Sequence, residues 1–166
     1  MSASIILSGC SSVSATGLSD SSTVSITSVE DSALATSELF TDRDMGQSAD
    51  LTDAVYIELV SGEDVTITAE GVYVLSGSAQ NTTVIVEAGD DEKVQIVLDG
   101  VIIENEGSPA IYVKSADKVF VTTTDSDNSM EVTGYYEADG ETNLDAVICS
   151  KSDLVLNGIG TLEIVS

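Results

Sequence analysis

The segment from residue 134 to residue 145 carries the side chains of this sequence that are best suited to chemistry. Oxygen-bearing residues alternate along its second half: Asp139, Glu141, Asn143 and Asp145. Calcium binds about six to eight oxygen ligands, mostly carboxylates and carbonyls, at roughly 2.3–2.6 Å. These residues, together with Asp153 from the following segment, could supply such ligands. The spacing is not that of an EF-hand, so a solvated acidic loop is the alternative interpretation.

Asp90 and Asp91, followed by Glu92, form a second acidic group that we expect to stack near Asp117 and Asp153. Like charges at one corner repel each other unless a cation or solvent screens them. Aspartate also favours turns because its side chain hydrogen-bonds the local backbone. Turn chemistry is therefore the simpler interpretation of this group, and a metal site that includes Asp90 and Asp91 is the alternative.

Three tyrosines are candidates for stacking against sugar rings: Tyr135, Tyr136 and Tyr112. The first two lie in the acidic segment, and the third is expected to project outward from a strand. Aromatic faces suit the C–H surfaces of β-linked glucans, and the phenol hydroxyl adds a hydrogen bond. The alternative is that a tyrosine anchors the loop by packing into a groove.

The composition excludes several classes of site. The chain of 166 residues has no His and no Trp and only two Cys, which argues against zinc sites built on imidazole or paired thiolates. A Ser-His-Asp or Cys-His nucleophile lacks its base. The formal charge of −24, from 29 acidic and 5 basic residues, argues against nucleic acids and anionic membrane surfaces as partners. Such a charge suits divalent cations, or it serves solubility alone.

The elements that must position these residues are short strands arranged in a repeat. The segment 94–101 reappears as 154–159, and the segment 110–117 reappears as 146–153. Like strands recur roughly every 25–30 residues, with three strands in each repeat and a polar turn after each strand. Matching at this offset, rather than between neighbouring strands, favours stacked coils over hairpins. The pattern predicts an all-β fold, a right-handed parallel β-helix with three strands per coil, over residues 51–166.

Alternation of apolar and polar residues predicts which side chains stack inside. The expected inner columns are Val84–Ile111–Val147, Val86–Val113–Cys149 and Ile96–Val121–Leu156. Cys149 is then a core thiol in place of a valine. On the outer face, Glu87 and Lys114 are expected to form an ion pair between successive coils.

The N-terminal fifty residues have a different character. Residues 6–10, which read Ile-Leu-Ser-Gly-Cys, resemble the lipobox of a bacterial lipoprotein signal, with Cys10 as the lipid-bearing residue. A basic leader and a long apolar run are missing before it, so residues 1–10 are interpreted as a signal remnant. Residues 11–50 are rich in Ser, Thr and Asp and are expected to be a disordered tether. The sequence stops inside a predicted strand, so we expect it to be the N-terminal part of a longer solenoid.

Five stretches resemble a family of calcium-binding, cellulose-binding β-helix proteins of anaerobic plant-degrading bacteria, the carbohydrate-binding domain proteins. They are residues 71–77, 89–94, 97–101, 109–113 and 150–158, and the resemblance covers about residues 60–166. It implies a fold like that of polysaccharide lyases and a bound Ca²⁺. It also implies affinity for cellulose or acidic plant sugars, an extracellular or cell-surface location, and binding rather than catalysis.

The sequence therefore predicts a non-catalytic, calcium-dependent binder of plant polysaccharide, monomeric and held at a bacterial surface through Cys10. A pectate-lyase-like enzyme is one alternative, but it needs a base to remove the proton next to the sugar carboxyl. The lysines are Lys93, Lys114, Lys118 and Lys151. All four lie among carboxylates, which raise the pKa of a lysine and oppose that role. A structural surface stalk or adhesin without sugar affinity is the other alternative.

Overall fold

The computed structural model describes residues 40–166, which form strands, turns and loops and contain no helix. Cys10 and most of the predicted tether lie outside these residues. No described helix could cross a membrane. The strands are β1 (Val55–Glu58), β2 (Val65–Ile67), β3 (Gly71–Gln80), β4 (Val84–Glu87), β5 (Lys93–Asn105), β6 (Ile111–Ser115), β7 (Lys118–Thr123), β8 (Asp127–Val132), β9 (Ile148–Ser150), β10 (Asp153–Gly158) and β11 (Thr161–Val165).

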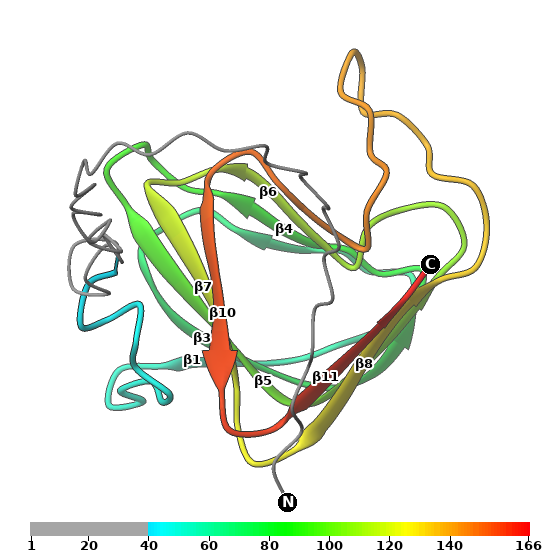
Figure 1. The fold of residues 1–166 in the computed structure, drawn as a ribbon. Helices are drawn as coiled ribbons and strands as arrows, with labels where there is room; N and C mark the ends of the chain where they lie inside the picture. The colour runs from blue at the N-terminus through cyan, green and yellow to red at the C-terminus, as the bar shows by residue number, and fades with distance from the viewer. Residues whose placement is uncertain (1–39) are drawn as a thin grey trace, which may run out of the picture. The chain divides into compact units, whose positions relative to one another are not determined.

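Every pair of neighbouring strands is parallel, and neighbours in a sheet are distant in sequence (Figure 1). One sheet has the order β1-β3-β5-β7-β10, and the second half of β5 continues onto β8 and then β11. The other sheet has the order β2-β4-β6-β9. Parallel pairing requires crossover connections, which explains why similar segments recur at long intervals in the sequence. The predicted all-β class with parallel strands is confirmed.

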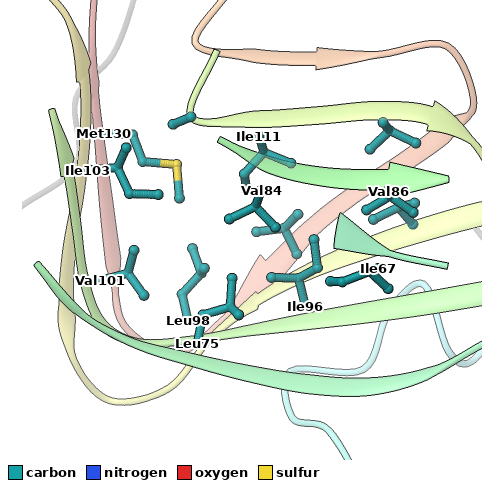
Figure 2. Close-up of a cluster of buried hydrophobic side chains, with 14 of the residues drawn as sticks. Ile67, Leu75, Val84, Val86, Ile96, Leu98, Val101, Ile103, Ile111 and Met130 are labelled. Carbon is teal, nitrogen blue, oxygen red and sulfur yellow. The ribbon is translucent and has the colours of Figure 1, made fainter. Parts of the chain in front are cut away.

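The core lies where the inner faces of the two sheets meet (Figure 2). Valine, isoleucine and leucine side chains from both sheets fill it, among them Val84, Ile111, Ile96 and Leu98, all fully buried. Burial of one such side chain stabilises the fold by about 1.5–3 kcal/mol. The alternation that points these residues inward directs their sequence neighbours outward, which decides which side chains are available for binding.

The strand pairings of most predicted inner columns are confirmed. Val84 pairs with Ile111 and Val86 pairs with Val113, while Ile96, Val121 and Leu156 align across three strands. Leu156 aligns as predicted but is 54% exposed, whereas the other two residues of its column are buried. The prediction for β9 is wrong by one residue: Ile148, not Val147, pairs with Ile111, and Cys149 pairs with Tyr112.

Cys149 therefore shares the outward-facing column of Tyr112 and is half-buried, so it is not a core thiol. A shift of one residue moves a strand's side chains to the opposite face. The ungapped match of residues 110–117 with residues 146–153 aligns Ile111 with Val147, which puts β9 one residue out of register. Val147, just before β9, is nevertheless buried in the core.

Two buried asparagines connect successive turns. Asn105 accepts a hydrogen bond from the Thr82 backbone N–H at 2.9 Å, and its amide nitrogen donates to the Thr82 carbonyl at 3.0 Å. Asn128 accepts from the Val101 N–H at 2.8 Å and donates to the Thr161 carbonyl at 2.9 Å. These bonds satisfy backbone groups that leave the strand ladders at the corners.

Residues 41–47, at the end of the predicted tether, contact the outer face of the β5-β7-β10 region, and we call them the N-terminal strap. The Arg43 guanidinium lies 4.5 Å from the centre of the Phe120 ring. Asp44 pairs with Lys118 at 3.1 Å, and Gln47 accepts a hydrogen bond from the Gly158 N–H at 3.3 Å.

Candidate functional site

The acidic segment forms the long loop between β8 and β9 and is attached to the outer face of the β2-β4-β6-β9 sheet (Figure 1). Within the loop, Asp139 and Thr142 exchange backbone hydrogen bonds at 3.0 and 2.9 Å. The Tyr112 hydroxyl on β6 donates to the Asp139 carboxylate at 3.2 Å. Lys151 donates to the Thr142 hydroxyl at 2.8 Å. These bonds hold the loop against the sheet.

The residues predicted to bind calcium in this loop do not converge. No group of three or more acidic or cysteine side chains within residues 40–166 is placed to hold a metal ion. The Asp139 carboxylate faces Tyr112 and lies 3.8 Å from the Lys114 ammonium, a cation that competes for the same oxygen. The remaining predicted ligands of the loop are exposed or partly exposed to solvent: Glu141, Asn143 and Asp145. In this arrangement the loop does not fit a calcium site, and calcium binding stays a prediction.

The second predicted acidic group does not form a continuous stack of carboxylates. Its exposed members include Asp90, Asp91, Asp117 and Asp153. Lys93 forms an ion pair with Asp117 and aligns with Lys118 on β7, which in turn aligns with the aspartate that begins β10. The two aligned lysines reduce the repulsion that a stack of carboxylates alone would create. The predicted ion pair between Glu87 and Lys114 is present at 2.9 Å.

The three candidate tyrosines occupy different environments. Tyr112 projects outward as predicted, but only 3% of it is exposed, and the Lys114 and Lys151 ammonium groups each lie 5.5 Å from its ring centre. Tyr136 packs against the core, and burial raises the pKa of its hydroxyl. Both therefore anchor the loop. Tyr135 is 96% exposed and is the candidate whose ring is free to meet a sugar.

A cavity of about 270 Å³ lies where β3, β5 and β8 end. We call it the polar notch. It is lined by Gln80, Asn81, Glu104, Asn105, Glu106, Glu131 and Thr133. Three of these residues form one outward-facing row, because Gln80 pairs with Glu104 and Glu104 pairs with Glu131.

The walls of the polar notch are held by hydrogen bonds. The Gln80 amide donates to the Glu104 carboxylate at 2.9 Å. Asn81 adopts a left-handed backbone conformation with φ of 50°, and its side-chain oxygen accepts from the Glu106 N–H at 3.2 Å. Asparagine tolerates this conformation better than most residues. The buried amide of Asn105 lies behind this turn and fixes its backbone.

Close packing of the backbone keeps Tyr135 beside the polar notch. The chain leaving β8 passes so near the turn after β5 that a Cβ on Gly107 would lie 2.9 Å from the Tyr135 carbonyl oxygen. A Cβ on Gly134 would collide with the carbonyl of Glu106. The Glu137 N–H donates to the Gly107 carbonyl at 2.8 Å. The exposed ring is thus carried by a segment that is packed against one wall of the notch.

This arrangement offers the chemistry that a sugar requires. Side-chain amides both donate hydrogen bonds to sugar hydroxyls and accept them, and carboxylates accept them. An aromatic ring covers a C–H face of the sugar. No salt bridge of residues 40–166 engages Glu104, Glu106 or Glu131, so their oxygens have no competing ammonium or guanidinium. The sequence analysis did not single out the polar notch. Aligning the repeats in register would have shown the polar row, because its members occupy equivalent positions of paired parallel strands.

Comparison with known proteins agrees with this chemistry. The profile of a family described as carbohydrate-binding domain-containing protein matches residues 61–166. A protein with the same description from Acetivibrio thermocellus is 35% identical over 108 residues, which cover 63% of this chain and 38% of that protein. The chain thus spans well under half the length of this relative. No solved structure matches. The profile covers more than half of the chain, which therefore belongs to the carbohydrate-binding domain-containing protein family.

Proposed function

We propose that this protein binds polysaccharide without cleaving it, and that the polar notch together with Tyr135 is the surface that contacts the sugar. The observation that carries the proposal is the placement of an exposed aromatic ring on a segment packed against a cavity lined by amides and carboxylates. Membership of the family supports the ligand class.

We also propose that the described strands are coils of a right-handed parallel β-helix. Strands recur in the same order in both sheets, and each pairs in parallel with its counterpart in the next repeat. Crossovers between parallel strands of one sheet are right-handed in nearly all known proteins. In such a fold the outer faces carry rows of equivalent residues, like the row in the polar notch.

The environments of the lysines favour a binder over a lyase. The hydrogen bond from Lys114 to Glu87 raises the pKa of that ammonium, which keeps it protonated and unable to act as a base. Lys93 pairs with Asp117, and Lys118 pairs with Asp44. Three of the four lysines thus form ion pairs with carboxylates.

The biological setting is a further part of the proposal and rests on the sequence resemblance. The target is a plant cell-wall polysaccharide, cellulose or an acidic sugar polymer. The protein acts as a monomer at the bacterial cell surface, with Cys10 as the lipid-bearing residue. Ca²⁺, which the same resemblance implies, takes part in binding.

A retention assay on insoluble polymer tests this proposal. The 166-residue chain is incubated with microcrystalline cellulose or with pectate coupled covalently to a resin, in calcium or in chelator. Retention that needs calcium, without release of unsaturated product, is the expected result. Failure to bind either polymer under all conditions would contradict the proposed sugar binding and favour a structural surface stalk. Release of unsaturated product would show that the protein is a polysaccharide lyase. Equal retention in calcium and in chelator would show that binding does not need calcium.

Matched variants locate the site. Loss of an aromatic contact worth about 0.5–1.5 kcal/mol weakens binding about two- to tenfold. Tyr135→Ala is therefore expected to lower the affinity for the polymer by this factor. The control is Tyr56→Ala, which removes another exposed tyrosine, 68% accessible, on β1. Glu104→Ala, compared with Glu70→Ala at another exposed site, tests the polar wall. Equal effects of site and control variants would place the sugar elsewhere.

A further inference from the structure

A second depression lies on the same outer face as the polar notch. It has a volume of about 370 Å³ and is lined by Ile102, Asp127, Asn128, Ser129, Thr161 and Glu163. Ile102 on β5 pairs with Ser129 on β8, and Ser129 pairs with Glu163 on β11. These three residues form a row across the strands, parallel to the row of the polar notch.

The two depressions adjoin each other. Ile102 and Glu104 are two residues apart on β5, as are Ser129 and Glu131 on β8, so both pairs point to one face. From Asp127 at the start of the second depression to Thr133 in the polar notch the chain extends about 20 Å, at roughly 3.3 Å per residue. The surface is thus elongated along the strands and is longer than one sugar ring.

The second depression repeats the chemistry of the polar notch with a different apolar element. Ser129 and Thr161 present hydroxyls, and the Thr161 hydroxyl donates to the Asp127 carboxylate at 2.8 Å. Ile102 is 41% exposed, which places an apolar patch between polar groups. A sugar ring has the same character, since its edges carry hydroxyls and its faces carry C–H groups.

The charge of this face restricts the ligand. Its carboxylates are Glu104, Glu106, Glu131, Asp127 and Glu163. No salt bridge of the described residues involves any of the five. Without a bridging cation, a chain of uronic acids laid along the strands would bring like charges together, whereas the hydroxyls of an uncharged chain donate to these oxygens.

We propose that the polar notch and the second depression are two subsites for one uncharged glycan chain, which lies along β5 and β8 and contacts both. This inference rests on the proposed function, because it requires the polar notch to bind sugar. It adds that the ligand is a chain of several units and that uncharged sugars are preferred to acidic ones.

Calorimetric titration with linear cello-oligosaccharides of two to six units tests the inference. Affinity is expected to rise with chain length, and the hexamer to bind at least tenfold more tightly than the dimer. Ile102→Ser is expected to weaken hexamer binding several-fold and to leave dimer binding unchanged, because the dimer occupies the polar notch. Ile159→Ser, at a 66% exposed isoleucine outside both depressions, is the control for solubility and folding. A galacturonate hexamer is expected to bind at least tenfold more weakly than the cello-hexamer.

The outcomes separate this inference from the proposed function. Equal affinities for dimer and hexamer, or equal weakening of both by Ile102→Ser, would show that the second depression is not a subsite. Either result would still be compatible with sugar binding in the polar notch. Tighter binding of the galacturonate hexamer would overturn the preference for uncharged chains. Absence of binding at every length, together with failure of the polymer assay, would overturn both proposals.

Discussion

At the residue scale, two glycines from matching turns of the repeat have different tasks. Gly100 follows Asp99, and Gly158 follows Asn157, in segments that the sequence analysis had matched. Both have positive φ, 72° and 121°. A Cβ on Gly100 would meet open space, whereas a Cβ on Gly158 would collide with the backbone of Thr123. The first glycine supplies only a backbone conformation, and the second also permits the close approach of the chain after β10 to the end of β7.

This difference gives a matched prediction for stability. Gly100→Ala is expected to lower the free energy of unfolding by about 1–2 kcal/mol, the cost of a left-handed conformation for an L-residue. Gly158→Ala is expected to cost clearly more, about 3 kcal/mol or above, because the backbone of Thr123 at the end of β7 must move. Urea denaturation followed by circular dichroism measures both. Equal losses would show that the turn after β10 relaxes freely.

At the element scale, the N-terminal strap is tied to the sheet by one buried carboxylate. Asp44 accepts hydrogen bonds from the Thr41 backbone N–H at 2.8 Å and from the Thr41 hydroxyl at 2.9 Å. Its ion pair with Lys118 crosses from the strap to β7. The hydrogen bonds from Thr41, with a smaller contribution from Lys118, lower the pKa of Asp44.

The strap is therefore expected to loosen in acid. A carboxyl group whose pKa is lowered by folding contributes stability above its unfolded pKa of about 3.9. That contribution is lost as the pH falls through the lower folded value. The ring resonances of Phe120, beneath Arg43, are expected to shift over this range in an NMR titration. Asp44→Asn should shift them at neutral pH already and remove this titration, while Asp42→Asn at the exposed neighbouring position should not. A titration that persists in the Asp44 variant would assign the effect to another group.

At the scale of the whole molecule, the charge of −24 is the dominant electrostatic property. Four salt bridges connect the described strands, strap and loop, and most acidic side chains lie outside them. Self-repulsion of this size opposes the compact state and is reduced by dissolved salt. Ionic strength alone must therefore raise the thermal stability before any specific ion is considered.

This background decides how calcium binding is measured. Sodium chloride is expected to raise the melting temperature. Calcium is expected to raise the melting temperature further than magnesium at equal ionic strength. An ion that binds only the folded state increases the free energy of unfolding, and this increase grows with the logarithm of the ion concentration. The comparison is made by differential scanning calorimetry, with Asp139→Asn as a variant of the acidic loop. Identical melting temperatures in calcium and magnesium would show that the acidic residues form no site specific for calcium. Their contribution would then be the negative charge that keeps the protein soluble.

The strand pattern and the inner columns were predictable because they depend on local alternation and on repetition. Val84 with Ile111, and Ile96 with Val121 and Leu156, follow from two-residue periodicity combined with the matching of similar sequence blocks. The prediction failed at β9 because residues 110–117 match residues 146–153 without a gap in the sequence but not in the structure. Ile111 pairs with Ile148, whereas Lys118 pairs with Asp153, so the chain between these two positions is shorter in the later repeat and the ungapped match placed Cys149 on the wrong face.

By itself, the sequence determined the all-β class, the parallel repeat, the acidic character and Tyr135 as a candidate for sugar contact. Only the tertiary structure decided that Tyr112 is covered, that Tyr136 is an anchor and that the acidic side chains of the loop do not converge. The polar notch also emerged only there, from β3, β5 and β8 and the turns that follow them. The physical reason is that periodicity specifies which way a side chain points from its own strand. Exposure and convergence depend on which distant segments pack over that strand or beside it.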